Sequence, residues 1–337
     1  MTQFNTGFTL FLSLLVEAIP FLLLGVLFSG LLLLFIDEGK LIAAMPKNPL
    51  LGAFAGSLIG FLFPVCECGN VPVARRLLMQ GVPAPVAIGF LLAAPTINPI
   101  VIWATWTAFR DQPEIVLLRV LCSLAIATII GWVFSAQADL RPMLHPLVAC
   151  SIPAPKPKLG KKDYSPSLLQ SGTFILGGKG TSIRMDTPEF IAAAGSITSK
   201  PLKDRLRLFL ENTVQELREL GAVLVVGSAI AATLQVAVPR EIILSLGQDP
   251  ITSIVAMMVL AAVVSICSTV DSFFALSFAS AFTSASLLAF LVFGPMIDLK
   301  AIGLMLSIFK SRAVFYLLAL AAQLTFLLTL IYQISFG

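Results

Sequence analysis

Long apolar runs, separated by prolines and glycines, constrain this chain more than any other feature. Several approach the roughly 20 residues that an α-helix needs to cross the hydrocarbon of a bilayer. Of the 337 residues 12% are charged and 58% are hydrophobic, whereas a soluble domain has about 25% charged residues. The sequence therefore predicts an all-α, polytopic membrane protein. The nearly charge-free segments are Phe8–Ile36, Ser123–Phe134, Gly221–Val238, Ile251–Val264 and Ala313–Ile334.

The polar stretch in the middle of the chain indicates three parts. Residues 137–204 are rich in Pro, Gly, Ser and Lys and read as a cytoplasmic linker, with a short hairpin around Gly172–Ile183. We expect residues 1–136 and 205–337 to be two membrane repeats. The N-terminus lacks the basic region of a signal peptide, so we expect the first helix to be retained. The net charge of +4 comes from this linker and short turns, and predicts no nucleic-acid partner.

The two halves resemble each other at a nearly constant separation in the sequence. EAIPFLLLG aligns with ELGAVLVVG, VCECGN with ICSTVD, and GFLLAAPTIN with AFLVFGPMID. Three matches in the same order predict an internal duplication. Lys40 and Lys47 place the end of the first helix in the cytoplasm, so the first copy crosses an odd number of times and the second is inverted. Two inverted repeats are the architecture of many secondary transporters.

Prolines and glycines interrupt the apolar segments at matching places in both halves. Freed backbone groups in a membrane must line a protected cavity, and matched breaks point to a transport site. We expect one break at CECGN and its partner at CSTVD, and a second pair at Asn98 and Asp298. Arg75 and Arg76 favour a re-entrant limb that returns to the cytoplasmic side.

If the repeats pack about a pseudo-twofold axis, the CECGN and CSTVD segments meet at the midplane. Thiolates select thiophilic solutes, and carboxylates within a membrane usually face a cavity or a partner. We therefore predict a solute site, with Cys66 and Cys68 as candidate metal ligands and with Glu17 and Asp271 as proton carriers. The predicted substrate-binding residues are Cys66, Cys68, Cys267, Glu67, Asn70, Asp271, Asn98 and Asp298.

The other polar residues have less specific interpretations. Asn98 and Asp298 either cap half-helices or coordinate a solute. Glu219, the repeat partner of Glu17, fits a carboxylate near the interface at a helix N-terminus. Lys300 is expected to mark the cytoplasmic edge. We read three further residues as incidental or structural: His145, Cys122 and Cys150.

PVCECGNVPVARRLL, followed by APTINP, resembles the predicted-permease family that contains the ArsP-type organoarsenical efflux permeases and the YraQ-like proteins. Its Cys-x-Cys-Gly-x-x-Pro and Ala-Pro-x-x-Asn-Pro signatures match here, from Cys66 to Pro72 and from Ala94 to Pro99. The resemblance implies a permease, with export of trivalent methylated arsenicals in some members. In the family pattern a serine stands where this chain has Glu67. A carboxylate beside thiols favours a divalent cation over a neutral arsenous species.

The sequence thus predicts a multi-pass permease of the plasma (inner) membrane that exports a thiophilic solute, with no cofactor and no enzymatic activity. Its GGKGTS is not a phosphate loop, because Gly180 follows Lys179 where a Walker A motif has Ser or Thr. Predicted partners are membrane lipid, a small solute or metalloid, and a homo-oligomer or accessory protein. Alternatives are a permease for an anionic or small polar solute with structural cysteines, an intramembrane redox enzyme, and a non-transporting scaffold subunit.

Overall fold

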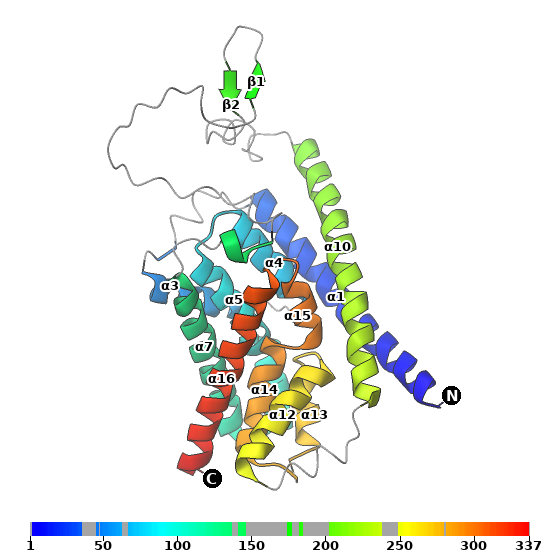
Figure 1. Cartoon of the computed structure of the whole chain (residues 1–337), viewed down its shortest axis with the longest axis vertical. Helices are drawn as coiled ribbons and strands as arrows, with labels where there is room; N and C mark the ends of the chain where they lie inside the picture. Colours follow the sequence, from blue (N-terminus) through cyan, green and yellow to red (C-terminus); the bar gives the residue numbers. More distant parts are fainter. Residues whose placement is uncertain are drawn as a thin grey trace.

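The computed structural model describes residues 2–35, 45–46, 48–62, 67–136, 141–145, 174–176, 182–184, 202–237, 249–279 and 281–336. Its elements are helical except for one small hairpin (Figure 1). The first half contains α1 (Thr2–Phe35), α3 (Pro49–Ile59), η1 (Gly60–Leu62), α4 (Glu67–Met79), α5 (Ala84–Ile97), α6 (Pro99–Ala108) and α7 (Pro113–Ser135). After η2 (Arg141–Met143), the second half contains α10 (Leu202–Ala237), α12 (Pro250–Val264), α13 (Asp271–Leu276), α14 (Ser284–Met296), α15 (Leu299–Met305) and α16 (Ser311–Phe336).

The predicted linker hairpin is confirmed. Strands β1 (Phe174–Leu176) and β2 (Ser182–Arg184) pair antiparallel, with Ile175 opposite Ile183. Both chain termini lie toward the end of the molecule opposite this hairpin (Figure 1).

Five helical segments of the described residues are long and apolar enough to cross a membrane. Two of them, Ala84–Ala108 and Ser284–Met305, are the most buried, and the chain leaves the helical conformation partway along each. Pro95 and Pro295 lie just before these interruptions, where the missing N–H and the ring disfavour a continuous helix. The predicted breaks at Asn98 and Asp298 are therefore confirmed, and they lie in the centre of the protein.

Asn98 and Asp298 begin the second piece of each broken span in the same way. The Asn98 Oδ1 accepts a hydrogen bond from the Ile100 N–H at 2.8 Å, and the Asp298 Oδ1 accepts one from the Ala301 N–H. Both side chains satisfy N–H groups that the first turn of a helix leaves without a partner. As a result, α6 and α15 both begin within a candidate membrane span.

Small residues allow the helices around the broken spans to pack closely. In the first half, α3, α5 and α7 form one group in which Gly89 lies against Ala53 and Gly131 lies against Pro85. In the second half, α12, α14 and α16 pack together. The long helices α1 and α10 lie side by side along one flank (Figure 1). Close approach of backbones at small residues is typical of helix packing in membranes.

The short helices connect the two halves. Helix α4 contacts α15, and α6 contacts α13, so each contact joins one half to the other. Helix α4 also crosses α1, where Gly25 lies directly against the backbone of Gly69. These contacts place the start of α4 and the start of α15 next to each other.

The two predicted CECGN and CSTVD breaks differ in detail. Helix α4 begins at Glu67, so most of CECGN forms a first helical turn, while Cys66 lies outside the described residues. In the second half, α12 ends at Val264 and α13 begins at Asp271, which leaves a non-helical segment between them. Ser265 starts this segment with a left-handed backbone (φ 48°), and its hydroxyl accepts a hydrogen bond from the Leu299 N–H at 3.1 Å.

Candidate functional site

The first polar cluster forms where α4 and α15 meet. The Lys300 Nζ lies 3.9 Å from the Glu67 Oε1, and the two side chains are only 2% and 3% exposed. The structure buries Lys300 against Glu67, and the prediction that Lys300 marks the cytoplasmic edge stays a prediction. Lys300 is the second residue of α15, which starts within the broken span Ser284–Met305, and its side chain lies inside the protein.

Asp298 is the second carboxylate beside Lys300. It is 1% exposed, and its charge interacts with the Lys300 ammonium. One of its oxygens caps α15, while Oδ2 has no hydrogen-bond partner. The Lys300 ammonium therefore interacts electrostatically with two buried carboxylates, Glu67 and Asp298, which come from different halves of the chain.

Two of the predicted cysteines belong to this cluster. Cys68 and Cys267 are buried and belong to no disulfide, and both thiols lie within electrostatic range of Glu67 and Lys300. The Thr269 hydroxyl donates to the Cys267 Sγ at 3.6 Å. Cys66 lies outside the described residues, so its place as a metal ligand stays a prediction. No group of three or more His, Cys, Asp or Glu among the described residues could hold a metal ion.

Several buried polar atoms of the two breaks lack a hydrogen-bond partner. The Asn70 Nδ2 donates to the Leu91 carbonyl at 2.7 Å, but its Oδ1 has no partner. Leaving such an atom unpaired costs about 1–3 kcal/mol. Unpaired buried groups are rare in folded proteins, and each of these atoms has the capacity to bind a further polar or charged group. The atoms are Glu67 Oε2, Asn70 Oδ1, Asp298 Oδ2 and Ser268 Oγ.

A second polar cluster lies between α6, α7 and α13. The Arg119 Nη2 donates to the Asp271 Oδ2 at 2.6 Å, and Nη1 donates to Oδ1 at 3.2 Å. Nη1 also donates to the Ser272 hydroxyl at 2.9 Å and to the Thr105 hydroxyl at 2.8 Å. The two charged side chains are 1% and 4% exposed. Asp271 therefore binds Arg119, and its part in solute or proton binding stays a prediction.

The segment between Cys267 and Asp271 joins the two clusters. Cys267 lies near Glu67, and the Cys267 carbonyl accepts a hydrogen bond from the Asp271 N–H at 3.0 Å. The two clusters are thus only a single turn of the chain apart. Sequence reasoning missed Arg119, although a charged residue within an otherwise apolar span is a recognisable signal of function.

The remaining predicted acidic residues are less buried. Glu17 is half-buried in the first candidate span. Glu219 is 42% exposed and accepts a hydrogen bond from the Arg75 Nη1 at 3.1 Å. Next to it, the Ser29 hydroxyl donates to Glu216 at 3.1 Å. The first contact holds α4 against α10, and the second holds α1 against α10. Arg75 therefore has a structural role.

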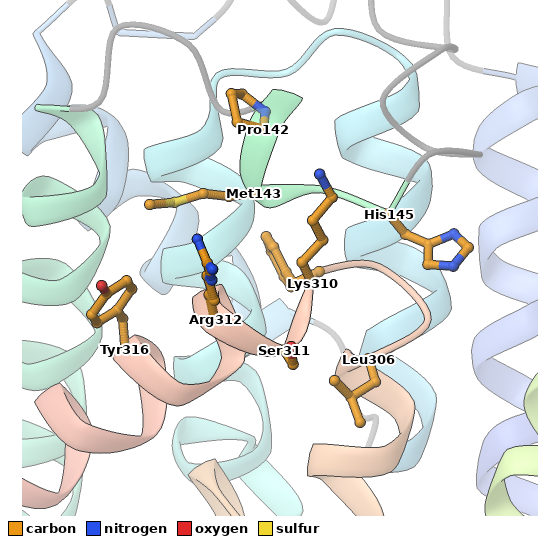
Figure 2. A pocket seen from close by; sticks show the side chains of 9 residues that line it. Pro142, Met143, His145, Leu306, Lys310, Ser311, Arg312 and Tyr316 are labelled. Carbon is orange, nitrogen blue, oxygen red and sulfur yellow. The ribbon is translucent and has the colours of Figure 1, made fainter.

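A pocket of about 670 Å³ opens beside η2 and the start of α16 (Figure 2). Lys310, Arg312 and Tyr316 line it, and His145 lies on its other side. The segment that carries His145 is fixed here, because the His145 N–H donates to the Ile308 carbonyl and the Lys310 N–H donates to the Met143 carbonyl, both at 2.8 Å. The pocket is distinct from both buried clusters.

Buried charges, broken central spans and five apolar helical segments among the described residues define the class of this chain: it is an all-α, multi-pass membrane protein. A family profile described as "predicted permease" matches residues 3–334, so the chain belongs to the ArsP_1 predicted-permease family. No solved structure matches it.

Two curated relatives align over most of their length. The chain is 38% identical over 310 residues to the UPF0718 protein YcgR of Bacillus subtilis, covering 92% of this chain and 91% of the relative. It is 32% identical over 303 residues to a putative two-component membrane permease complex subunit of Streptococcus mutans, covering 90% and 87%. The family membership and these relatives support a membrane transporter.

Proposed function

We propose that this protein is a secondary transporter of the plasma (inner) membrane that exports a thiophilic solute through a site at Glu67, Cys68, Cys267, Asp298 and Lys300. One observation carries the proposal: two thiols and two carboxylates, drawn from both halves, are buried together where broken helices start. Soft thiol ligands select thiophilic solutes such as a trivalent organoarsenical or a soft metal ion.

The arrangement of the breaks supports a transport pathway. Half-helices that begin inside the membrane and unpaired polar atoms beside them are typical of solute sites in transporters with inverted repeats. The inverted duplication itself is part of the proposal. Its support is that helix α4 corresponds to α13 and α6 to α15, so the contact between α4 and α15 has its counterpart in the contact between α13 and α6.

The proposal also includes the residues that couple transport to protons and a protein partner that assists it. Asp271 and Glu17 are the proposed proton carriers, because carboxylates inside a membrane are costly and usually functional. The relative in Streptococcus mutans is described as a subunit of a two-component complex. We therefore include an accessory membrane protein, or a second copy of this chain, as a partner.

Replacing Cys68 or Cys267 with serine will reduce export of methylarsenite or Cd²⁺ from cells by roughly tenfold or more. Removing even an outer-shell partner of a bound ion typically costs that much. The measurement is retained solute in cells that express equal amounts of each variant. Cys122→Ser is the matched control, because Cys122 lies in α7 outside the cluster and is only half-buried; its export should equal that of the wild type.

Export unchanged in both Cys68→Ser and Cys267→Ser would reject the thiol role. The anionic-solute alternative would then gain support if Lys300→Gln abolished uptake or export of a small anion. A chain that co-purifies with a partner but transports neither kind of solute would instead be a scaffold subunit.

A further inference from the structure

The pocket between η2 and the start of α16 carries positive charge that nothing in the described part of the chain neutralises. Lys310 and Arg312 line the pocket, and their side chains extend from the start of α16 toward η2 (Figure 2). All nine residues of its lining are described, and none of them is acidic. No ion pair between described residues involves either of the two cations. The pocket is therefore suited to an anion.

The donors around this pocket match a phosphate group. Helix α16 begins at Ser311, and the first N–H groups of a helix have no partner within it. These N–H groups and the helix dipole favour an anion at this end of the helix. The guanidinium of Arg312 can donate two parallel hydrogen bonds to a phosphate, while the Lys310 ammonium supplies a compact charge beside it. In the same lining, the buried His145 Nδ1 has no hydrogen-bond partner among the described residues.

The pocket lies at a height in the molecule where a bilayer has its headgroups. It falls between two candidate membrane spans, after the end of Ser284–Met305 and at the start of Ser311–Phe336. Basic pockets between membrane helices bind the headgroups of anionic lipids. Helix η2 comes before the linker that the sequence predicts to be cytoplasmic, and the cytoplasmic leaflet is the anionic one. Lipid phosphate is therefore abundant where this pocket opens.

Exposed apolar surface continues from the pocket onto α16. Leu306 lines the pocket and is 42% exposed, and Phe315 and Tyr316 in α16 are 65% and 51% exposed. Tyrosine is enriched at membrane–water interfaces, where its ring lies in an apolar environment and its hydroxyl in a wet one. The volume of about 670 Å³ is that of a small-molecule site and much larger than a single phosphate ion. The surface thus fits an amphiphile better than a free anion.

We propose that this pocket binds an anionic phospholipid, with the headgroup phosphate on Lys310 and Arg312 and an acyl chain along Phe315 and Tyr316. The phosphate relieves the repulsion between the two cations, which lie two residues apart. The bound headgroup also joins η2 to α16, two elements that are far apart in the sequence. The pocket is separate from both buried clusters, so this inference does not depend on which solute the protein transports.

The test is binding of phosphatidylglycerol with one fluorescent acyl chain to the purified full-length protein in an uncharged detergent, measured by fluorescence anisotropy. Lys310→Gln/Arg312→Gln should weaken binding roughly tenfold or more, because it removes the hydrogen bonds to a charged phosphate. Arg110→Gln/Arg218→Gln is the matched control, since it removes two exposed cations outside the pocket; its affinity should equal that of the wild type. Phosphatidylcholine with the same label should bind roughly tenfold more weakly than phosphatidylglycerol, because its headgroup has no net charge.

Inorganic phosphate, added as a competitor, distinguishes a lipid site from a site for a free anion. Its effect is compared with that of sodium chloride at the same ionic strength, because salt alone screens exposed charges. Displacement of the lipid by phosphate well beyond the effect of chloride would overturn the lipid inference in favour of a free phosphate. Equal binding of the two lipids, or equal weakening in the two double variants, would also overturn it. Should Lys310→Gln/Arg312→Gln fail to fold, Arg312→Gln against Arg110→Gln decides: weaker binding in the first alone supports the site, and equal binding overturns it.

Discussion

Arg119→Met will lower the free energy of unfolding by about 3–5 kcal/mol, because it leaves the Asp271 carboxylate buried without a counter-charge. Arg119 makes hydrogen bonds to both oxygens of Asp271, at 2.6 and 3.2 Å, and the pair is almost fully enclosed. The same substitution removes the donors to Thr105 and Ser272. Denaturant or thermal unfolding of the detergent-purified protein measures the loss.

The double variant Arg119→Met/Asp271→Leu provides the sharper comparison. Replacing both members of a buried ion pair by apolar residues is often neutral for stability, whereas removing one member is not. The double variant should therefore recover most of the stability that the single variant loses. Arg110→Met is the control, because Arg110 is exposed in the turn before α7. A single variant as stable as the wild type would show that the pair contributes nothing.

Gly25→Ala will destabilise the protein by about 1–3 kcal/mol and will abolish transport. A Cβ atom at position 25 overlaps the carbonyl oxygen and Cα of Gly69, so α4 must move away from α1. Overpacking at a close contact costs an amount of this order. Because Gly69 follows Cys68 directly, the same shift displaces the thiol and Glu67 from Lys300. Unfolding in detergent and solute export from cells measure the two effects.

Gly221→Ala is the matched control for this prediction. Gly221 also lies in a long helix, α10, but a Cβ atom there meets nothing within 4 Å. Alanine is favoured over glycine by up to about 1 kcal/mol in a helix. Gly221→Ala should therefore leave transport intact and stability equal or slightly higher. If both glycine variants had the same stability and the same export, the backbones of α1 and α4 would not be in close contact at Gly25.

Much of the architecture could be predicted from local sequence. Apolar segments gave the spanning helices, and prolines at matching positions gave the breaks before Asn98 and Asp298. These features depend on hydropathy and on the backbone restrictions of proline, which act over a few residues. The linker hairpin was also predictable from its turn residues. The inverted relation of the two halves stays a prediction.

The partners of the buried charges could not be predicted in this way. Lys300 follows a proline break and resembles a residue at the membrane edge, and only the packing of α15 against α4 reveals that it faces Glu67. Arg119 and Asp271 are far apart in the sequence and come from different halves. Asn70 lies in the predicted motif, but its bond to the Leu91 carbonyl depends on the contact between α4 and α5. Ion pairs of this kind are decided by tertiary packing, which a single sequence does not encode locally.

The length of helix α10 and the charges of its first turns bear on how it can lie in a bilayer. Its 36 residues make a rod of about 54 Å, while the hydrocarbon of a bilayer is about 30 Å thick. A rod of this length is longer than the hydrocarbon is thick, even when it is tilted by about 40°. The charged end is LKDRLRLFLENTVQELREL, which follows the linker. The charged turns of α10 are thus an extension of its apolar turns, and hydrocarbon suits only the apolar part of the helix.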